Sequence, residues 1–223
     1  MGAVIGEILP LALGVAISPI PIIAVILMLL SSKARVTSVG FLLGWVAGII
    51  VAVTLFTLLA SVLPAPGSES ASPVRGTIQL VLGILLLILA LRQWRGRPHP
   101  GQEAALPKWM QAIDKVTFPV ALGLGFLLSA VNPKNLLMAA GAGVDIGSAE
   151  LSVGSIVVVI AIFTLIAAST VLVPVVGYLV AAERLHGALD ALRGWLAREN
   201  AVIMAVLLLV IGVSMIGKGI GSF

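Results

Sequence analysis

Six apolar segments, each close to the length of a membrane span, divide the chain. They cover residues 8–30, 39–63, 77–91, 118–143, 151–182 and 201–220. A helix needs roughly 20 apolar residues to cross about 30 Å of hydrocarbon, whereas the strands of a membrane barrel alternate apolar and polar positions. The segments show no such alternation. The pattern therefore predicts an all-α integral membrane protein with six transmembrane helices.

The composition narrows the classes of function. Of the 223 residues, 60% are hydrophobic and 10% are charged, and the mean hydropathy is +1.21. The absence of cysteine excludes disulfide scaffolds and thiolate chemistry, and His99 and His186 have no carboxylate cluster at metal-ligand spacing. No nucleophile and base pair is recognisable either. We therefore expect no enzyme activity, no catalytic residue, no metal site and no cofactor.

The basic residues predict the orientation. Ten of the twelve basic residues in loops or near the termini fall in the first, third and fifth loops, and only Arg75 and Lys218 fall on the other side. The positive-inside rule then places these loops in the cytoplasm and both termini outside it. The net charge of +4 is explained by basic loops at an anionic membrane face, so we expect no nucleic-acid partner.

A proline-rich loop separates two groups of three spans. We predict a first three-helix repeat over residues 1–91, a cytoplasmic linker over 92–115 and a second repeat over 116–223. Pro19 and Pro133 are 114 residues apart, and Ser38 and Ser152 have the same separation. Repeated units of three spans have opposite orientations, which predicts an inverted repeat of the transporter kind. Chance agreement among common membrane residues is the alternative explanation of so short a match.

Prolines interrupt the first and fourth spans at corresponding places. Pro19 and Pro21 free the backbone carbonyls of residues 15 and 17, and Pro133 frees that of residue 129. Paired helix breaks near the midplane are typical of a transport site, although a packed kink is the other interpretation, which we prefer for Pro174. The predicted substrate-binding residues are Ser18, Pro19, Pro21, Asn132, Pro133, Lys134 and Asn135.

Lys134 is the one charged residue well inside a predicted span. An intramembrane charge is costly and indicates a functional site, and a helix that begins beside it adds its positive dipole end. Lys134 is therefore predicted to attract an anion; alternatively, it is a structural lysine bonded to the freed carbonyls. Glu7, Asp145 and Glu150 lie close to the predicted outer surface, where we expect ordinary interfacial carboxylates.

Hydroxyl groups and glycines give weaker indications. Hydroxyl side chains on the second and fifth spans either line a pathway or bond back to their own helix: Thr54, Thr57, Thr164, Ser169 and Thr170. Gly40, Gly44 and Gly48 form a stripe that predicts close helix packing. Leucines at helical spacing over residues 183–199 predict an interfacial amphipathic helix or a surface clip between two spans.

The broken spans resemble those of a known group of exporters. Six helices in two halves, with Ser18-Pro19-Ile20-Pro21 in the first span and Asn132-Pro133-Lys134-Asn135 in the fourth, resemble the LysE superfamily. The long central loop and the Asn-Pro-Lys-Asn-Leu stretch are most similar to its GAP family, the sulfolipid- and peptidoglycolipid-addressing proteins. The resemblance implies a multi-pass protein of the bacterial plasma membrane that moves complex glycolipids or their precursors toward the cell surface. Amino-acid exporters of the superfamily carry Pro-Gly-Pro where this chain has Pro19-Ile20-Pro21. This difference argues against amino-acid efflux and favours a more apolar site.

These observations leave three hypotheses. The first is an exporter of a glycolipid, lipid precursor or other amphiphile that alternates access around the broken helices, with Lys134 binding an anionic headgroup. The second is an exporter of amino acids or other small solutes. The third is a non-transporting accessory subunit that binds lipid-synthesis or export machinery through its cytoplasmic loops. A second copy of the chain is a further candidate partner.

The orientation can be tested because the chain has no cysteine of its own. In intact cells, an impermeant thiol reagent is expected to label Ser68→Cys, in a predicted outer loop, and to leave Gly101→Cys unlabelled. Labelling of Gly101→Cys but not of Ser68→Cys would reverse the predicted topology.

Overall fold

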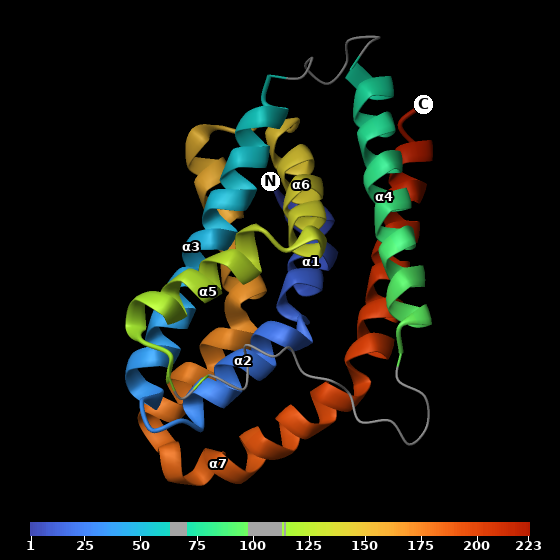
Figure 1. The fold of residues 1–223 in the computed structure, drawn as a ribbon. Coiled ribbons are helices and arrows are strands. Elements are labelled where there is room, and N and C mark those ends of the chain that lie inside the picture. The colour runs from blue at the N-terminus through green and yellow to red at the C-terminus, as the bar shows by residue number, and fades with distance from the viewer. Residues whose placement is uncertain (63–70, 98–112, 114) are drawn as a thin grey trace.

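The computed structural model describes residues 1–62, 71–97, 113 and 115–223, where every regular element is helical (Figure 1). Most of the predicted linker over 92–115, together with Ser68, His99 and Gly101, lies outside the described residues. The elements are α1 (Gly2–Ala16), α2 (Pro19–Leu29), α3 (Ala34–Ala60), α4 (Ala71–Arg95), α5 (Phe118–Ala130), α6 (Pro133–Gly147) and α7 (Val153–Ile220).

Both predicted helix breaks are present. The chain bends by 52° between α1 and α2 and by 60° between α5 and α6. Four helical segments are long and apolar enough to cross a membrane alone, and there are six spans if each bent pair counts as one. Among the described residues, each half of the chain therefore contains one bent pair followed by two long helical segments.

The last two spans differ from the prediction because one helix joins them. Residues 183–199 belong to α7, a helical run of 68 residues whose one non-helical residue is Ala181, with φ −144° and ψ 50°. The helix continues through Pro174. Beyond the bend, α7 crosses one end of the bundle (Figure 1) and buries Leu189 and Leu196 while Trp195 stays exposed. The predicted helix over this segment is confirmed, but no loop separates it from its neighbours.

Glycines allow α3 and α5 to pack backbone against backbone. A Cβ atom added at Gly44 would overlap the carbonyl oxygen of Leu122, and one at Gly125 would overlap the carbonyl oxygen of Phe41. Gly40 and Gly48 also face α5. The predicted stripe is therefore a packing surface within the chain, where a side chain larger than hydrogen does not fit.

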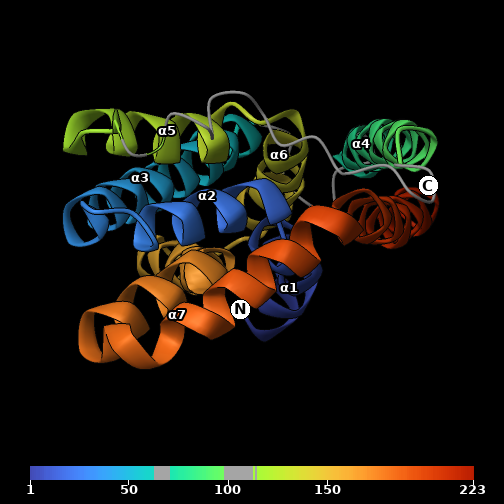
Figure 2. The ribbon, with the colours of Figure 1, turned by 60° about the horizontal axis from the view of Figure 1, so that its bottom comes forward.

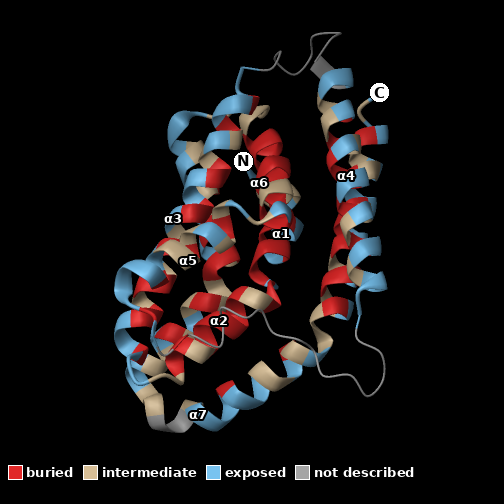
Figure 3. Cartoon of the chain, viewed as in Figure 1, coloured by how far each residue is buried: buried red, intermediate tan, exposed pale blue. Residues whose placement is uncertain are grey.

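A second glycine-mediated contact joins α4 to the last part of α7. Gly76 lies against the carbonyl of Gly219, and Gly83 lies against that of Gly212. α4 and residues 200–220 of α7 lie side by side in Figures 1 and 2. We call this pair the hairpin, although its two helices are not consecutive in the sequence. The short helices α2 and α6 bury the largest share of their residues (Figure 3).

The close packing of α3 and α5 predicts a difference between two glycines of the same helix. Gly125→Ala is expected to lower stability by about 1–3 kcal/mol, because its methyl group meets the backbone of α3. Gly123→Ala is the matched control, since no atom lies within 4 Å of an added Cβ there. Thermal unfolding in detergent measures both variants, and equal melting temperatures would contradict the packing.

Candidate functional site

The two helix breaks face each other inside the bundle. Ser18 precedes α2 and Asn132 precedes α6 in extended backbone conformation, and each helix begins with proline. Proline suits the first helical position because that position needs no backbone donor. The side chain of Asn132 accepts a 3.0 Å hydrogen bond from the backbone N–H of Lys134, which caps α6. The local sequence thus starts a new helix at each break.

Lys134 reaches from the first turn of α6 to the end of α1. Its ammonium group donates to the carbonyl of Gly14 and to Oγ of Ser18, each at 2.5 Å. Lys134 is buried, with 7% of its surface exposed. The C-terminal end of a helix carries partial negative charge, which stabilises a cation there. The described contacts occupy two of the three ammonium donors, so one N–H has no partner among the described residues.

Hydroxyl groups satisfy the next carbonyls of α1. Ser18 Oγ donates to the carbonyl of Val15 at 2.8 Å, and Thr170 Oγ1 of α7 donates to that of Ala16 at 2.6 Å. Asn135 is 2% exposed and donates through Nδ2 to the carbonyl of Leu128 at 3.0 Å. These contacts hold both breaks in place, so Asn135 and Thr170 belong to the support of the site.

A cavity of about 350 Å³ opens beside the breaks. This volume lies in the range of ligand sites, roughly 300–1,000 Å³. Six of the seven predicted substrate-binding residues line it; the seventh, Asn135, is buried and does not line it. The described lining residues are Ser18, Pro19, Ile20, Pro21, Leu89, Arg92, Gln93, Asn132, Pro133, Lys134, Asn200, Met204 and Leu208.

The hairpin supplies the wall of the cavity that the sequence did not indicate. Arg92 and Gln93 come from the end of α4, and Asn200 comes from α7. Asn200 Oδ1 is shielded from solvent and has no hydrogen-bond partner among the described residues. The sequence predicts Arg92 in the cytoplasmic linker, whereas it lies in the last turn of α4. The sequence signal for its place was that Arg92 and Asn200 fall on the same predicted side of the membrane.

The five predicted pathway hydroxyls do not line this cavity. Thr57 and Ser169 bond to carbonyls of their own helices at 2.8 and 2.7 Å, and Thr170 reaches α1 as described above. Thr164 Oγ1 is buried without a described partner, and Thr54 is half-buried. Bonding within a helix is therefore the role that the structure gives to two of these side chains.

Asp145 corrects one expectation. It is 2% exposed and forms ion pairs with Arg75 and Lys218, so it is a buried, paired carboxylate instead of an ordinary interfacial one. The expectation failed because the cationic partners of Asp145 come from α4 and α7, which lie far away in the sequence. Among the described residues, no group of three or more acidic or histidine side chains could hold a metal ion.

The fold and the site define a multi-pass helical membrane protein with a cavity between two broken helices. The chain belongs to the family described as Sap, sulfolipid-1-addressing protein, which matches residues 8–221. This match confirms the resemblance to the glycolipid-addressing proteins. No curated protein and no solved structure matches the chain.

Proposed function

We propose that this protein exports an amphiphile with an anionic headgroup, such as a glycolipid or its precursor, by alternating access around the two helix breaks. The observation that carries the proposal is that two cationic side chains and an apolar surface line the same cavity. Lys134 and Arg92 provide positive charge, and Leu89, Met204 and Leu208 provide apolar surface. None of the described residues that line the cavity is acidic.

This lining favours an amphiphile over an amino acid. A free amino acid carries an ammonium group, which is best matched by a carboxylate in a site of low polarity. A lipid headgroup with one negative charge needs only the cations, and its chains need an apolar contact. The family is described by the addressing of a sulfolipid, which is an anionic amphiphile.

We propose that the two halves of the chain form an inverted repeat and that their relative movement provides the alternation of access. Each half contains a bent pair and two long helical segments in the same order, and the two bends meet at Lys134 and Ser18. Two halves of opposite orientation that rock against each other would expose this site to one side of the membrane at a time. We propose that the cavity faces the cytoplasm, because Arg92 lines it and Arg95 and Arg97 follow on the same predicted cytoplasmic side.

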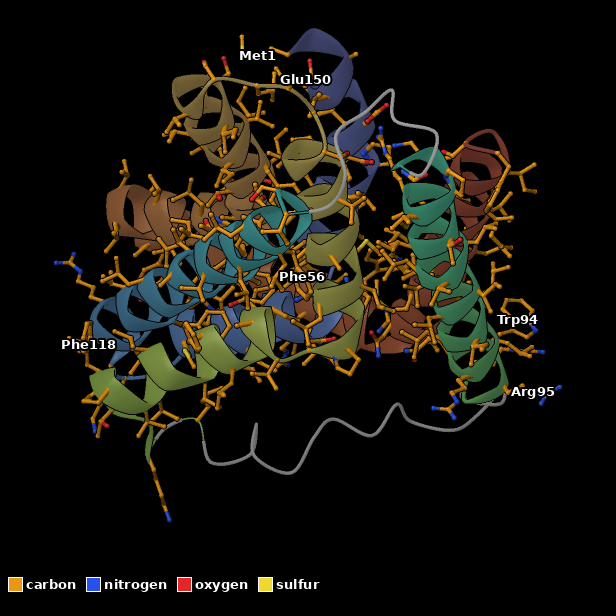
Figure 4. The ribbon with its side chains drawn as sticks, turned by 90° about the horizontal axis from the view of Figure 1, so that it is seen from above. Met1, Phe56, Trp94, Arg95, Phe118 and Glu150 are labelled. Carbon is orange, nitrogen blue, oxygen red and sulfur yellow. The ribbon has the colours of Figure 1, made fainter. Side chains whose placement is uncertain are left out.

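The first test compares two arginines one turn apart. Arg92→Gln is expected to lower export about tenfold, since it removes a charge from the cavity wall. Arg95→Gln is the control, because Arg95 does not line the cavity and points away from the bundle (Figure 4). Surface and total envelope glycolipid, measured in cells carrying each variant, give the export rate. Equal loss in both variants would contradict a headgroup role for Arg92.

Lys134 is tested in the same cells. Lys134→Ala is expected to abolish export, and Lys134→Arg is expected to retain part of it because the charge remains. The amount of protein in the membrane is measured alongside, since Lys134 also bonds to Gly14. Normal export by Lys134→Ala would refute the binding role, and loss of the protein from the membrane would favour the structural role.

The substrate class is tested by removing the protein. We expect an envelope glycolipid to decrease at the cell surface and to accumulate inside, with amino-acid efflux unchanged. Altered amino-acid efflux with a normal lipid profile would support the small-solute exporter instead. Purified protein in liposomes separates an exporter from an accessory subunit, because an accessory subunit alone moves no lipid.

A further inference from the structure

Charged side chains from four helices meet at the end of the bundle opposite the cavity. Arg75 Nη2 lies 3.4 Å from Glu7 Oε2 and 3.3 Å from Asp145 Oδ1, and Lys218 Nζ lies 3.2 Å from Asp145 Oδ2. Gln79 Nε2 donates to Asp145 Oδ1 at 3.1 Å. We call these five residues the charge cluster. None of them lines the cavity.

The two signs of charge in the cluster come from two different parts of the bundle. Both cations and Gln79 belong to the hairpin, on α4 and α7, whereas Glu7 and Asp145 belong to α1 and α6. The ion pairs therefore hold the hairpin against α1 and α6, which we call the half-helices because each is one part of a broken span. Separation of these two parts would leave Asp145 without its charged partners, which is costly for a carboxylate that is 2% exposed.

The cavity lies between the same two parts at the other end. Arg92 and Asn200 belong to the hairpin, while Ser18 and Lys134 lie at the ends of the half-helices. Glycine contacts join the two helices of the hairpin in the half nearer the charge cluster, where Gly76 lies against Gly219 and Gly83 against Gly212, so they favour movement of the two helices as one body. The hairpin thus contacts α1 and α6 through ion pairs at one end and is separated from them by the cavity at the other. A rigid-body rotation of the hairpin would change the two ends in opposite ways.

We propose that the charge cluster is a gate, and that the hairpin rocks against α1 and α6 to open the cluster as it closes the cavity. The inference rests on the alternating access proposed above. α1 and α6 connect the two ends, because α6 carries Lys134 in its first turn and Asp145 near its last, and α1 carries Glu7 and Gly14. The structure shows the state in which the cluster is closed.

The balance of charge makes the gate able to open. The two acidic and two basic groups cancel, and Arg75 Nε is buried without a hydrogen-bond partner among the described residues. A polar network that is incompletely satisfied holds a closed state less firmly than a complete one. Asp145→Asn would leave a net positive charge, so repulsion between Arg75 and Lys218 would favour the open gate.

Two cysteine reporters in the cysteine-free chain test the gate. Met215 is buried one turn deeper than Lys218, and Gln93 lines the cavity. Met215→Cys and Gln93→Cys are each combined with Asp145→Asn in purified full-length protein in lipid nanodiscs. The rate of reaction with a charged maleimide is expected to rise about tenfold at residue 215 and to fall by a similar factor at residue 93.

Glu150→Gln is the matched control, because Glu150 is an exposed acidic residue outside the charge cluster. It is expected to leave both rates unchanged. Lys218→Met serves as a second gate variant, which removes one ion pair and keeps a long side chain. As with Asp145→Asn, the rate is expected to rise at residue 215 and to fall at residue 93.

Opposite changes at the two reporters distinguish a gate from a structural anchor. A rise at both residues, no change at either, or failure of both cluster variants to remain monodisperse would overturn the proposal. The measurement needs no substrate, so its outcome is independent of the export assays. Reciprocal rates without lipid export would support the gate and the alternating access on which it rests, and would reject a glycolipid as the substrate.

Discussion

Backbone carbonyls at a helix break in an apolar environment must be given hydrogen-bond partners, and this constraint organises the centre of the protein. The last carbonyls of α1 belong to Gly14, Val15 and Ala16, and their partners are Lys134, Ser18 and Thr170. These three side chains come from α6, the break itself and α7. Satisfying one helix end therefore fixes the positions of three segments and brings the second helix break against the first.

The distribution of charge gives the two ends of the bundle different properties. At the cavity, Lys134 keeps an N–H that no described residue uses, and no described lining residue is acidic. At the charge cluster, each cation already contacts a carboxylate. An anion would thus be attracted at the cavity, whereas the cations of the charge cluster are already neutralised. The proposed export requires such a difference between the two ends of the bundle.

The features that were predictable from sequence are those that depend on local chemistry. Proline determines where α2 and α6 begin, and an apolar surrounding makes Lys134 conspicuous. Arg92 and Asn200 were missed because their place in the cavity depends on how the hairpin packs, a contact between segments distant in the sequence. Asp145 was misjudged for the same reason. The continuity of α7 was missed because an amphipathic pattern is equally compatible with a separate surface helix and with a bent extension of a span.

The glycine contacts between α3 and α5 have a consequence for how the protein tolerates substitution. At Gly44 and Gly125 the neighbouring atoms belong to the backbone, so every other residue type presents the same obstacle and no compensating change of side chain relieves it. Large apolar residues on the outer faces, such as Leu58 and Val180, have neighbours on few sides and admit many replacements. Sequence divergence in this fold is therefore expected to accumulate on its outer faces, while its smallest residues change least.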